Sequence, residues 1–226
     1  VGSEMCIRDS LQLACDIYGV DIVGGDTSAS LTGLCISITC IGEGEKEKIV
    51  TRSGAKDTDL VCVSGDLGAA YMGLQLLERE KRVFKGEKEF TPDFTGKEYL
   101  LERQLKPEAR KDIIELLDKA GIVPTSMMDI SDGLSSELLH ISKQSNVGCR
   151  IYEDRIPIDY QTAAMAEQFN MNLSTAALNG GEDYELLFTV PLTVHDKVSE
   201  MKGVKVIGHI TPVSYTHLTL PTNSRV

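Results

Sequence analysis

The residues of this sequence best suited to chemistry are acidic side chains that stand beside glycines in three short segments. One segment, residues 127–134, holds Asp129 and Asp132 with a serine between them, just before an expected helix. The others read Gly-Gly-Asp-Thr at 24–27 and Gly-Gly-Glu-Asp-Tyr at 180–184. Glycines let a ligand approach the backbone closely, amides at a helix start attract phosphate, and carboxylates attract the magnesium that accompanies it. Together the three segments indicate a nucleotide-binding enzyme.

The carboxylates favour a hard divalent metal ion. For each segment alone, an ordinary helix cap or turn explains the residues about equally well. If Asp26, Asp129 and Asp132 converge, two carboxylates about 4 Å apart repel by about 4 kcal/mol at an effective dielectric near 20. The amides at a helix N-terminus offset only about 0.3 to 1 kcal/mol of this repulsion, so a cation is required. Magnesium prefers oxygen ligands such as these carboxylates, and histidine ligands are scarce because the chain has only four histidines.

The common nucleotide-binding motifs are absent from the sequence. No Gly-x-x-x-x-Gly-Lys-Ser/Thr occurs, and no Gly-x-Gly-x-x-Gly follows an expected strand. The turn at 65–68, Gly-Asp-Leu-Gly, follows a strand and opens a helix, but packing explains it better than phosphate binding. Arg52 lies near the expected domain junction and could meet a phosphate, although a lone arginine is more often a solvated charge.

Composition narrows the classes of partner. The chain has 226 residues, with 23 Lys plus Arg against 34 Asp plus Glu, so its formal charge is −11. This charge disfavours binding to nucleic acid or to anionic membranes. No apolar run is long enough to span a membrane, and the six cysteines lack zinc-ligand spacing. We expect a cytoplasmic protein.

The alternation of expected strands and helices predicts an α/β or α+β layered fold. Residues 80–97 lack periodicity and are expected to form a surface loop. Expected strands lie at 20–23, 31–41, 59–63, 126–130, 148–152, 185–190 and 204–207, and expected helices at 11–19, 68–77, 107–120, 134–141, 160–168 and 194–201.

The two ends do not fit this pattern. Residues 3–10 and 213–223 resemble translated sequencing-adapter scars, so we expect these residues to have no role in the fold. We therefore expect an internal fragment of a longer protein. Residues 1–50 would be a remnant of an amino-terminal ATP- and magnesium-binding domain, with 1–10 non-native. Residues 51–212 would be a carboxy-terminal α/β domain, and 213–226 a non-native tail.

Five segments in this order resemble the thiamine-monophosphate kinase family, over roughly residues 11–212. Each segment alone is unspecific, but the ordered set is highly specific. That family belongs to the aminoimidazole-ribonucleotide-synthetase-like superfamily, whose members have two α/β domains and use ATP between them. The segments are Val-Gly-Gly-Asp-Thr at 23–27, Thr-Arg-Ser-Gly-Ala-Lys at 51–56, Val-Ser-Gly-Asp-Leu-Gly at 63–68, Met-Met-Asp-Ile-Ser-Asp-Gly-Leu at 127–134 and Gly-Gly-Glu-Asp-Tyr-Glu-Leu-Leu-Phe-Thr-Val-Pro at 180–191.

The resemblance implies that ATP passes its γ-phosphoryl group to thiamine monophosphate, yielding thiamine diphosphate and ADP. Phosphoryl transfer depends on positioning and charge neutralisation, and the attacking phosphate oxygen is already ionised, so we assign no general base. By resemblance, Asp26, Asp129 and Asp132 would hold magnesium, Gly25, Arg52 and Ser131 would contact the nucleotide, and Glu182 would contact the substrate.

The chain also departs from the family pattern. The family's amino-terminal Gly-Asp-Asp turn with further metal ligands is absent, as is the aromatic thiamine contact expected beyond the carboxyl end. We expect the intact parent to be an active homodimer and the given chain to be inactive, with its self-association open. Two alternatives remain: another ATP-using synthetase of the superfamily, which the tyrosine-bearing block at 180–186 disfavours, and a non-catalytic magnesium- or nucleotide-binding module.

Overall fold

A computed structural model describes residues 2–31, 33–83, 92, 94–212 and 216–219 of the chain. The chain divides into two compact units, Val1–Glu45 and Lys46–Val226, and each is described by itself. In the described part, no helix is long and apolar enough to cross a membrane.

The first unit contains one helix, α1 (Gly2–Tyr18), followed by irregular chain in the residues described. The helix begins earlier than the predicted position 11. It ends at Tyr18, one residue before the predicted position 19, because Gly19 adopts a φ of 66°, a left-handed conformation that glycine tolerates well. The amide of Val20 then donates to the carbonyl of Cys15 at 3.0 Å and closes the last turn.

The predicted strands at 20–23 and 31–41 are wrong. Neither range is assigned as a strand in the described part of the first unit, and apolar side chains such as Leu31, Leu34 and Ile41 are largely exposed. The alternating pattern is present in the sequence, but a strand also needs a neighbour to accept its backbone hydrogen bonds. The segment 24–27 therefore lies in a loop, as predicted, without flanking strands.

The second unit is built on a mixed sheet whose order is β2-β4-β1-β5-β3-β6 among the residues described. The four pairings among the first five strands in this order are antiparallel, and β6 is parallel to β3. The layered α+β prediction is confirmed. The strands are β1 (Leu60–Ser64), β2 (Ser126–Ile130), β3 (Gly148–Tyr152), β4 (Glu185–Val190), β5 (Val204–Thr211) and β6 (Thr216–Thr219).

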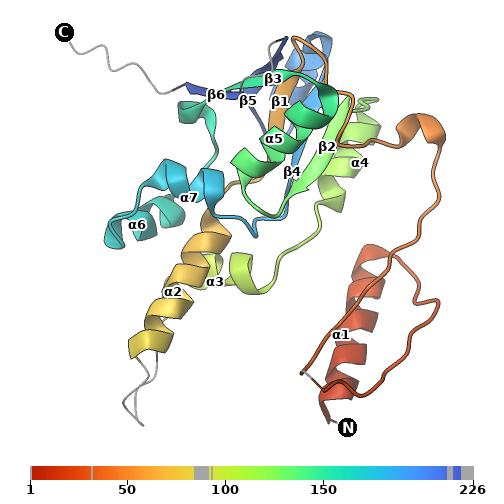
Figure 1. Cartoon of the computed structure of the whole chain (residues 1–226), viewed down its shortest axis with the longest axis vertical. Helices are drawn as coiled ribbons and strands as arrows, with labels where there is room; N and C mark the ends of the chain where they lie inside the picture. Colours follow the sequence, from red (N-terminus) through yellow and green to blue (C-terminus); the bar gives the residue numbers. More distant parts are fainter. Residues whose placement is uncertain (1, 32, 84–91, 93, 213–215, 220–226) are drawn as a thin grey trace. The chain divides into compact units, whose positions relative to one another are not determined.

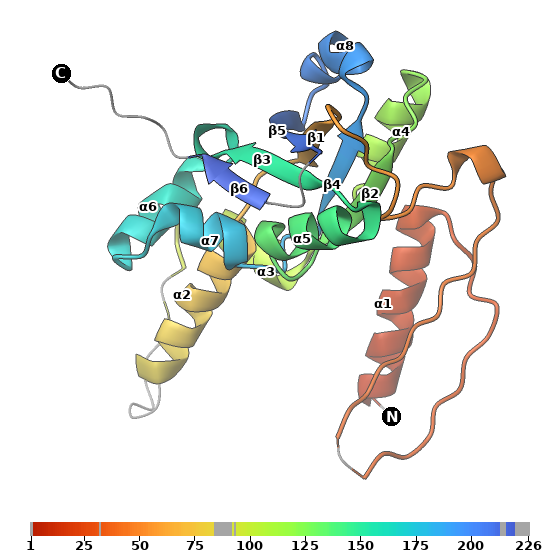
Figure 2. The same cartoon turned by 45° about the horizontal axis from the view of Figure 1, so that its top comes forward.

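Helices cover both faces of the sheet (Figure 2). On one face, α5 (Leu134–Ser145) buries Leu134, Leu138 and Ile141, which recur at helical spacing in the sequence. On the other face lie α4 (Lys111–Lys119) and α8 (His195–Ser199). Helix α4 begins at 111 rather than at the predicted 107. Short 3-10 turns lie at Lys46–Lys48, Glu153–Arg155 and Leu192–Val194.

Four helices lie beside the sheet (Figure 1), and their buried side chains form a third apolar cluster. They are α2 (Ala69–Val83), α3 (Glu98–Leu105), α6 (Tyr160–Gln168) and α7 (Leu173–Asn179). Helices α3 and α7 were not predicted. The spacing of Leu67, Tyr71, Leu74 and Leu77 predicts one apolar face for this helix. Leu67 is buried in the main core and Tyr71 packs against the cluster, but Met72 and Leu76 are the fully buried large residues of α2 that contact it.

Two sequence predictions reach beyond the described residues. Of the expected loop at 80–97, the first residues continue α2 to Val83, whereas 84–91 and 93 lie outside the described chain. In the carboxy-terminal stretch, only 216–219 are described after residue 212, as strand β6. The domain assignment and the non-native character of both ends stay predictions.

Candidate functional site at one end of the sheet

Two of the three acidic segments meet at the end of the sheet where β2 finishes and β4 begins. The strands are antiparallel neighbours, with Ile130 opposite Glu185. Beyond them the amide of Glu182 donates to the carbonyl of Ser131 at 2.7 Å, and the amide of Tyr184 donates to the carbonyl of Ile130 at 2.8 Å. The segment at 127–134 is therefore joined by main-chain hydrogen bonds to the segment at 180–184.

Glycines permit this close approach. Gly181 has a φ of 69°, and a Cβ atom there would lie 2.7 Å from the carbonyl oxygen of Ser131. Gly133 has a φ of 113°, and its Cβ would lie 2.8 Å from the carbonyl oxygen of Leu178. Both the backbone conformation and the available space thus require glycine.

The side chains that face solvent at this end are acidic. Asp129, Asp132 and Glu182 are exposed, and the hydroxyl of half-buried Tyr184 donates to Oε2 of Glu182 at 3.1 Å. This hydrogen bond raises the pKa of Tyr184, and burial and the charges of Glu182, Asp129 and Asp132 act in the same direction. The three carboxylates therefore act together as a local anionic field that can attract a cation.

A buried carboxylate supports the turn that carries Asp132. Glu137 on α5 is 1% exposed, and its Oε1 accepts the amide of Asp132 at 3.1 Å. Its other oxygen is buried without a hydrogen-bond partner among the described residues. Burial raises the pKa of Glu137, and the amide of Asp132 acts in the opposite direction.

Asp183, the neighbour of Glu182, points inward instead of toward solvent. It is 2% exposed, and Oδ2 accepts the amide of Gly68 at 2.9 Å while Oδ1 accepts that of Ala70 at 3.5 Å. Burial raises the pKa of Asp183 to about 7, although these amides and Arg103 act in the opposite direction. Amides that a phosphate would use at the start of α2 already bind a carboxylate, which agrees with the packing interpretation of the turn at 65–68.

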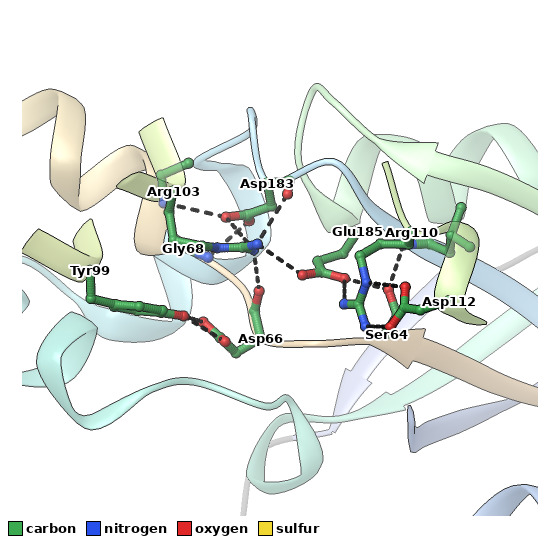
Figure 3. Close-up of polar contacts among 11 residues, drawn as sticks. Ser64, Asp66, Gly68, Tyr99, Arg103, Arg110, Asp112, Asp183 and Glu185 are labelled. Atoms are coloured by element: carbon green, nitrogen blue, oxygen red, sulfur yellow. Dashed lines mark hydrogen bonds and ion pairs between the residues drawn. The ribbon is translucent and has the colours of Figure 1, made fainter. Parts of the chain in front are cut away.

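A buried ion network lies beside Asp183 (Figure 3). Glu185 is 2% exposed and forms an ion pair with Nη1 of Arg103 at 2.9 Å. Its Oε2 atom also accepts hydrogen bonds from Arg110 and, at 2.5 Å, from the hydroxyl of Ser64. Charges removed from water need such partners, and Glu185 has them on both oxygens.

Arg103 ties the network to the turn at the end of β1. Its Nη2 atom donates to the carbonyl of Asp66 at 3.0 Å and to the carbonyl of Asp183 at 3.3 Å. The hydroxyl of Tyr99, also on α3, donates to both carboxylate oxygens of Asp66, at 2.7 and 2.6 Å. Helix α3 is thereby fixed to the turns that end β1 and precede β4.

The remaining predicted site residues lie elsewhere. Arg52 is exposed, and its neighbour Thr51 accepts the amide of Met127 at 2.9 Å, which places Arg52 beside the strand that carries Asp129. Gly25 and Asp26 are exposed in the loop of the first unit. The convergence of Asp26 with Asp129 and Asp132 stays a prediction.

Sequence reasoning missed the buried members of the site. Arg103 and Arg110 lie in segments without a recognisable motif, and Glu137 and Glu185 were not singled out. One signal was available: Glu185 opens the otherwise apolar strand Glu-Leu-Leu-Phe-Thr-Val, and a charge there requires a partner.

The part of the chain that forms this site matches a known protein family. Residues 58–220, which hold both joined segments and the ion network, match the family described as AIR synthase related protein, C-terminal domain. The chain belongs to this family. The match lies within the second unit and contains the described helices and strands from β1 to β6.

Curated relatives are similar over most of the chain. Thiamine-monophosphate kinase of Aquifex aeolicus is 35% identical over 214 residues, which is 90% of this chain and 65% of that protein. The same kinase of Pyrococcus horikoshii is 37% identical over 198 residues, or 83% of this chain and 56% of the relative. The chain thus spans about two thirds or less of the length of these relatives.

Solved structures give the same picture. The structure of AaThiL complexed with AMPPCP and TMP has a TM-score of 0.74 at 30% identity, and covers 93% of this chain and 62% of that chain. Thiamine-monophosphate kinase from Stenotrophomonas maltophilia has a TM-score of 0.64 at 27% identity, over 76% of this chain and 53% of that chain. Escherichia coli HypE, at 15% identity and a TM-score of 0.55, shares the fold alone.

Proposed function

We propose that this chain carries part of the machinery of a thiamine-phosphate kinase, which transfers the γ-phosphoryl group of ATP to thiamine monophosphate and forms thiamine diphosphate and ADP. One observation carries the proposal. The amide of Glu182 donates to the carbonyl of Ser131 at 2.7 Å, so the substrate residue and a nucleotide residue implied by the family resemblance lie on joined turns. The similarity to curated kinases over most of the chain supports it.

The carboxylates at this end of the sheet suit magnesium. In the described part of the chain, no three His, Cys, Asp or Glu side chains gather closely enough to hold a metal ion by themselves. Magnesium commonly takes one or two protein carboxylates together with water and the phosphates of the substrate. The exposed Asp129 and Asp132 fit that role, with Asp26 as the further ligand that we propose from the first unit. When bound, the metal would neutralise charge on the transferred phosphoryl group.

The other proposed contacts bind and orient the two substrates. Ser131 and Arg52 would bind the nucleotide, since a hydroxyl and a guanidinium are suitable donors to phosphate oxygens. Gly25 would let the nucleotide approach the backbone closely. Glu182 would contact thiamine monophosphate. Because the acceptor phosphate is already ionised, the residues need only hold the two phosphates in line and offset their repulsion.

The experiment that tests this function uses the protein in its full natural length, supplied with ATP, thiamine monophosphate and magnesium. The expected result is stoichiometric formation of thiamine diphosphate and ADP, with no ATP consumption when amide or selenide acceptors replace thiamine monophosphate. Consumption of ATP with one of those acceptors would identify another synthetase of the superfamily. Tight binding of magnesium and ADP without any product would identify a non-catalytic module. The same assay on the 226-residue chain tests our prediction that the chain alone is inactive.

A further inference from the structure

The turn that carries Glu182 has an unusual backbone. Glu182 and Tyr184 have φ values of 61° and 51°, in the left-handed region that residues with a side chain rarely adopt. Such conformations persist only where the surroundings impose them. The two side chains meet at the surface, where the hydroxyl of Tyr184 donates to Glu182. The residue between them, Asp183, points into the protein.

The side chain of Asp183 makes contacts that can impose the left-handed conformation on Glu182 and Tyr184. Its carboxylate lies at the start of α2, where it accepts the amide of Gly68 at 2.9 Å and that of Ala70 at 3.5 Å. A negative charge at a helix N-terminus is stabilised by the unpaired amides and the helix dipole. Nη2 of Arg103 lies 3.9 Å from Oδ1 of Asp183 and donates to its main-chain carbonyl at 3.3 Å. The residue is thus held at both its side chain and its backbone.

We infer that Asp183 is a positioning residue for Glu182. By filling the N-terminus of α2, its carboxylate fixes the turn from which Glu182 and Tyr184 face solvent. The inference deepens the proposed function, on which it rests where it treats Glu182 as the contact to thiamine monophosphate. Asp183 itself is too deeply buried to touch a ligand, since it is 2% exposed.

The test uses hydrogen exchange of the 226-residue chain with the substitution Asp183→Ala at pH 8, above the raised pKa of about 7, where the Asp183 carboxylate of the unsubstituted chain is ionised. The amides of Glu182 and Tyr184 should exchange at least about tenfold faster, because the turn loses a charge-assisted anchor. The amide of Phe188, in the middle of β4, is the internal control and should keep its rate. Added formate should restore protection by occupying the vacated helix N-terminus, whereas chloride at the same ionic strength should not. Unchanged exchange in the variant, or no response to formate, would overturn the inference.

A second variant covers the case in which Asp183→Ala does not fold. Asp183→Asn keeps the size of the side chain and one acceptor oxygen but loses the charge. It should give intermediate exchange at Glu182 and Tyr184, and formate should have no effect because the space stays filled. Exchange equal to that of the unsubstituted chain would contradict the role of the carboxylate.

Binding of thiamine monophosphate to the full-length protein separates this inference from the proposed function. If Glu182 contacts the substrate, Glu182→Gln and Asp183→Ala should each weaken binding by about tenfold or more, and formate should restore binding only in Asp183→Ala. Weaker binding in Glu182→Gln alone would overturn the positioning role. If both variants bind normally while Asp183→Ala loosens the turn, the substrate contact is wrong and the anchoring of the turn stands.

Discussion

At the end of the sheet where β2 finishes and β4 begins, two groups of carboxylates lie close in sequence and differ in their surroundings. The exposed carboxylates are Asp129, Asp132 and Glu182, and the buried carboxylates are Glu137, Asp183 and Glu185. Members of the buried group accept hydrogen bonds from backbone amides or arginines of the protein. The exposed group faces solvent, where a cation or a substrate can reach it. Adjacent residues with the same chemistry, such as Glu182 and Asp183, can therefore have opposite roles.

Among the substitutions that test the difference between the two groups, Glu185→Ala should have the largest effect on stability. The substitution leaves the guanidinium groups of Arg103 and Arg110 without their shared buried partner. Removing one member of a buried ion pair costs about 3 to 5 kcal/mol, which denaturant unfolding would measure. Glu182→Ala is the matched control in the exposed group and should change stability by less than about 0.5 kcal/mol. Equal losses in the two variants would remove the distinction between the groups.

The second-largest effect should be on the pH dependence of stability, and it involves Asp183. Burial raises the pKa of Asp183 from 3.8 to about 7, so between these values the folded chain holds a proton that the unfolded chain has lost. The stabilising contribution of this group is fully present below pH 3.8 and is lost as the pH rises toward 7. The slope is at most about 1.4 kcal/mol per pH unit. Unfolding of Asp183→Asn, measured from pH 4 to 8, should lack this contribution. Parallel curves for the two proteins would contradict it.

A smaller effect should follow from Gly181→Ala, which tests the contact between the two acidic segments. The new Cβ would lie 2.7 Å from the carbonyl oxygen of Ser131 at a backbone φ of 69°. Gly121→Ala is the matched control, because its φ is 66° and nothing lies within 4 Å of its Cβ. Both substitutions carry backbone strain, so Gly181→Ala should cost about 1 kcal/mol or more beyond Gly121→Ala. Thermal unfolding of the two variants gives the difference, and equal losses would argue against tight contact.

The smallest effect on stability should come from Asp129→Asn. This side chain is exposed at the end of β2, so the free energy of unfolding should change by less than about 0.5 kcal/mol. A loss above about 2 kcal/mol in denaturant unfolding would mean that Asp129 supports the fold, as the buried carboxylates do.

The sequence predicted β2, β3 and β4 at their observed bounds, because each is a short run of apolar residues set off by glycine or polar residues. It failed at 20–23 and 31–41, where apolar residues also have the spacing of a strand. The difference is physical: a strand depends on the backbone groups of another segment, and sequence pattern alone does not reveal whether that segment is present. Helices α3 and α7 were missed because they have only eight and seven residues, about two turns each, which is too short for a helical repeat of apolar residues to be recognised.

In the candidate site, too, some residues could be predicted from the sequence and others could not. The glycines beside the exposed carboxylates made residues 129–132 and 182 recognisable, since that combination is a local pattern. The buried network was not recognisable because its members come from α3, the start of α4, and the strands β1 and β4. Long-range pairs such as Arg103 with Glu185 leave no local signal except a charge within an apolar strand.

If the exposed carboxylates hold the metal that phosphoryl transfer requires, the magnesium dependence of thiamine diphosphate formation should change when one of them loses its charge. The full-length protein and its Asp129→Asn variant would be compared at saturating ATP and thiamine monophosphate. The variant should need at least about tenfold more magnesium for half-maximal rate, since it lacks one ligand charge. Superimposable magnesium curves for the two proteins would contradict it.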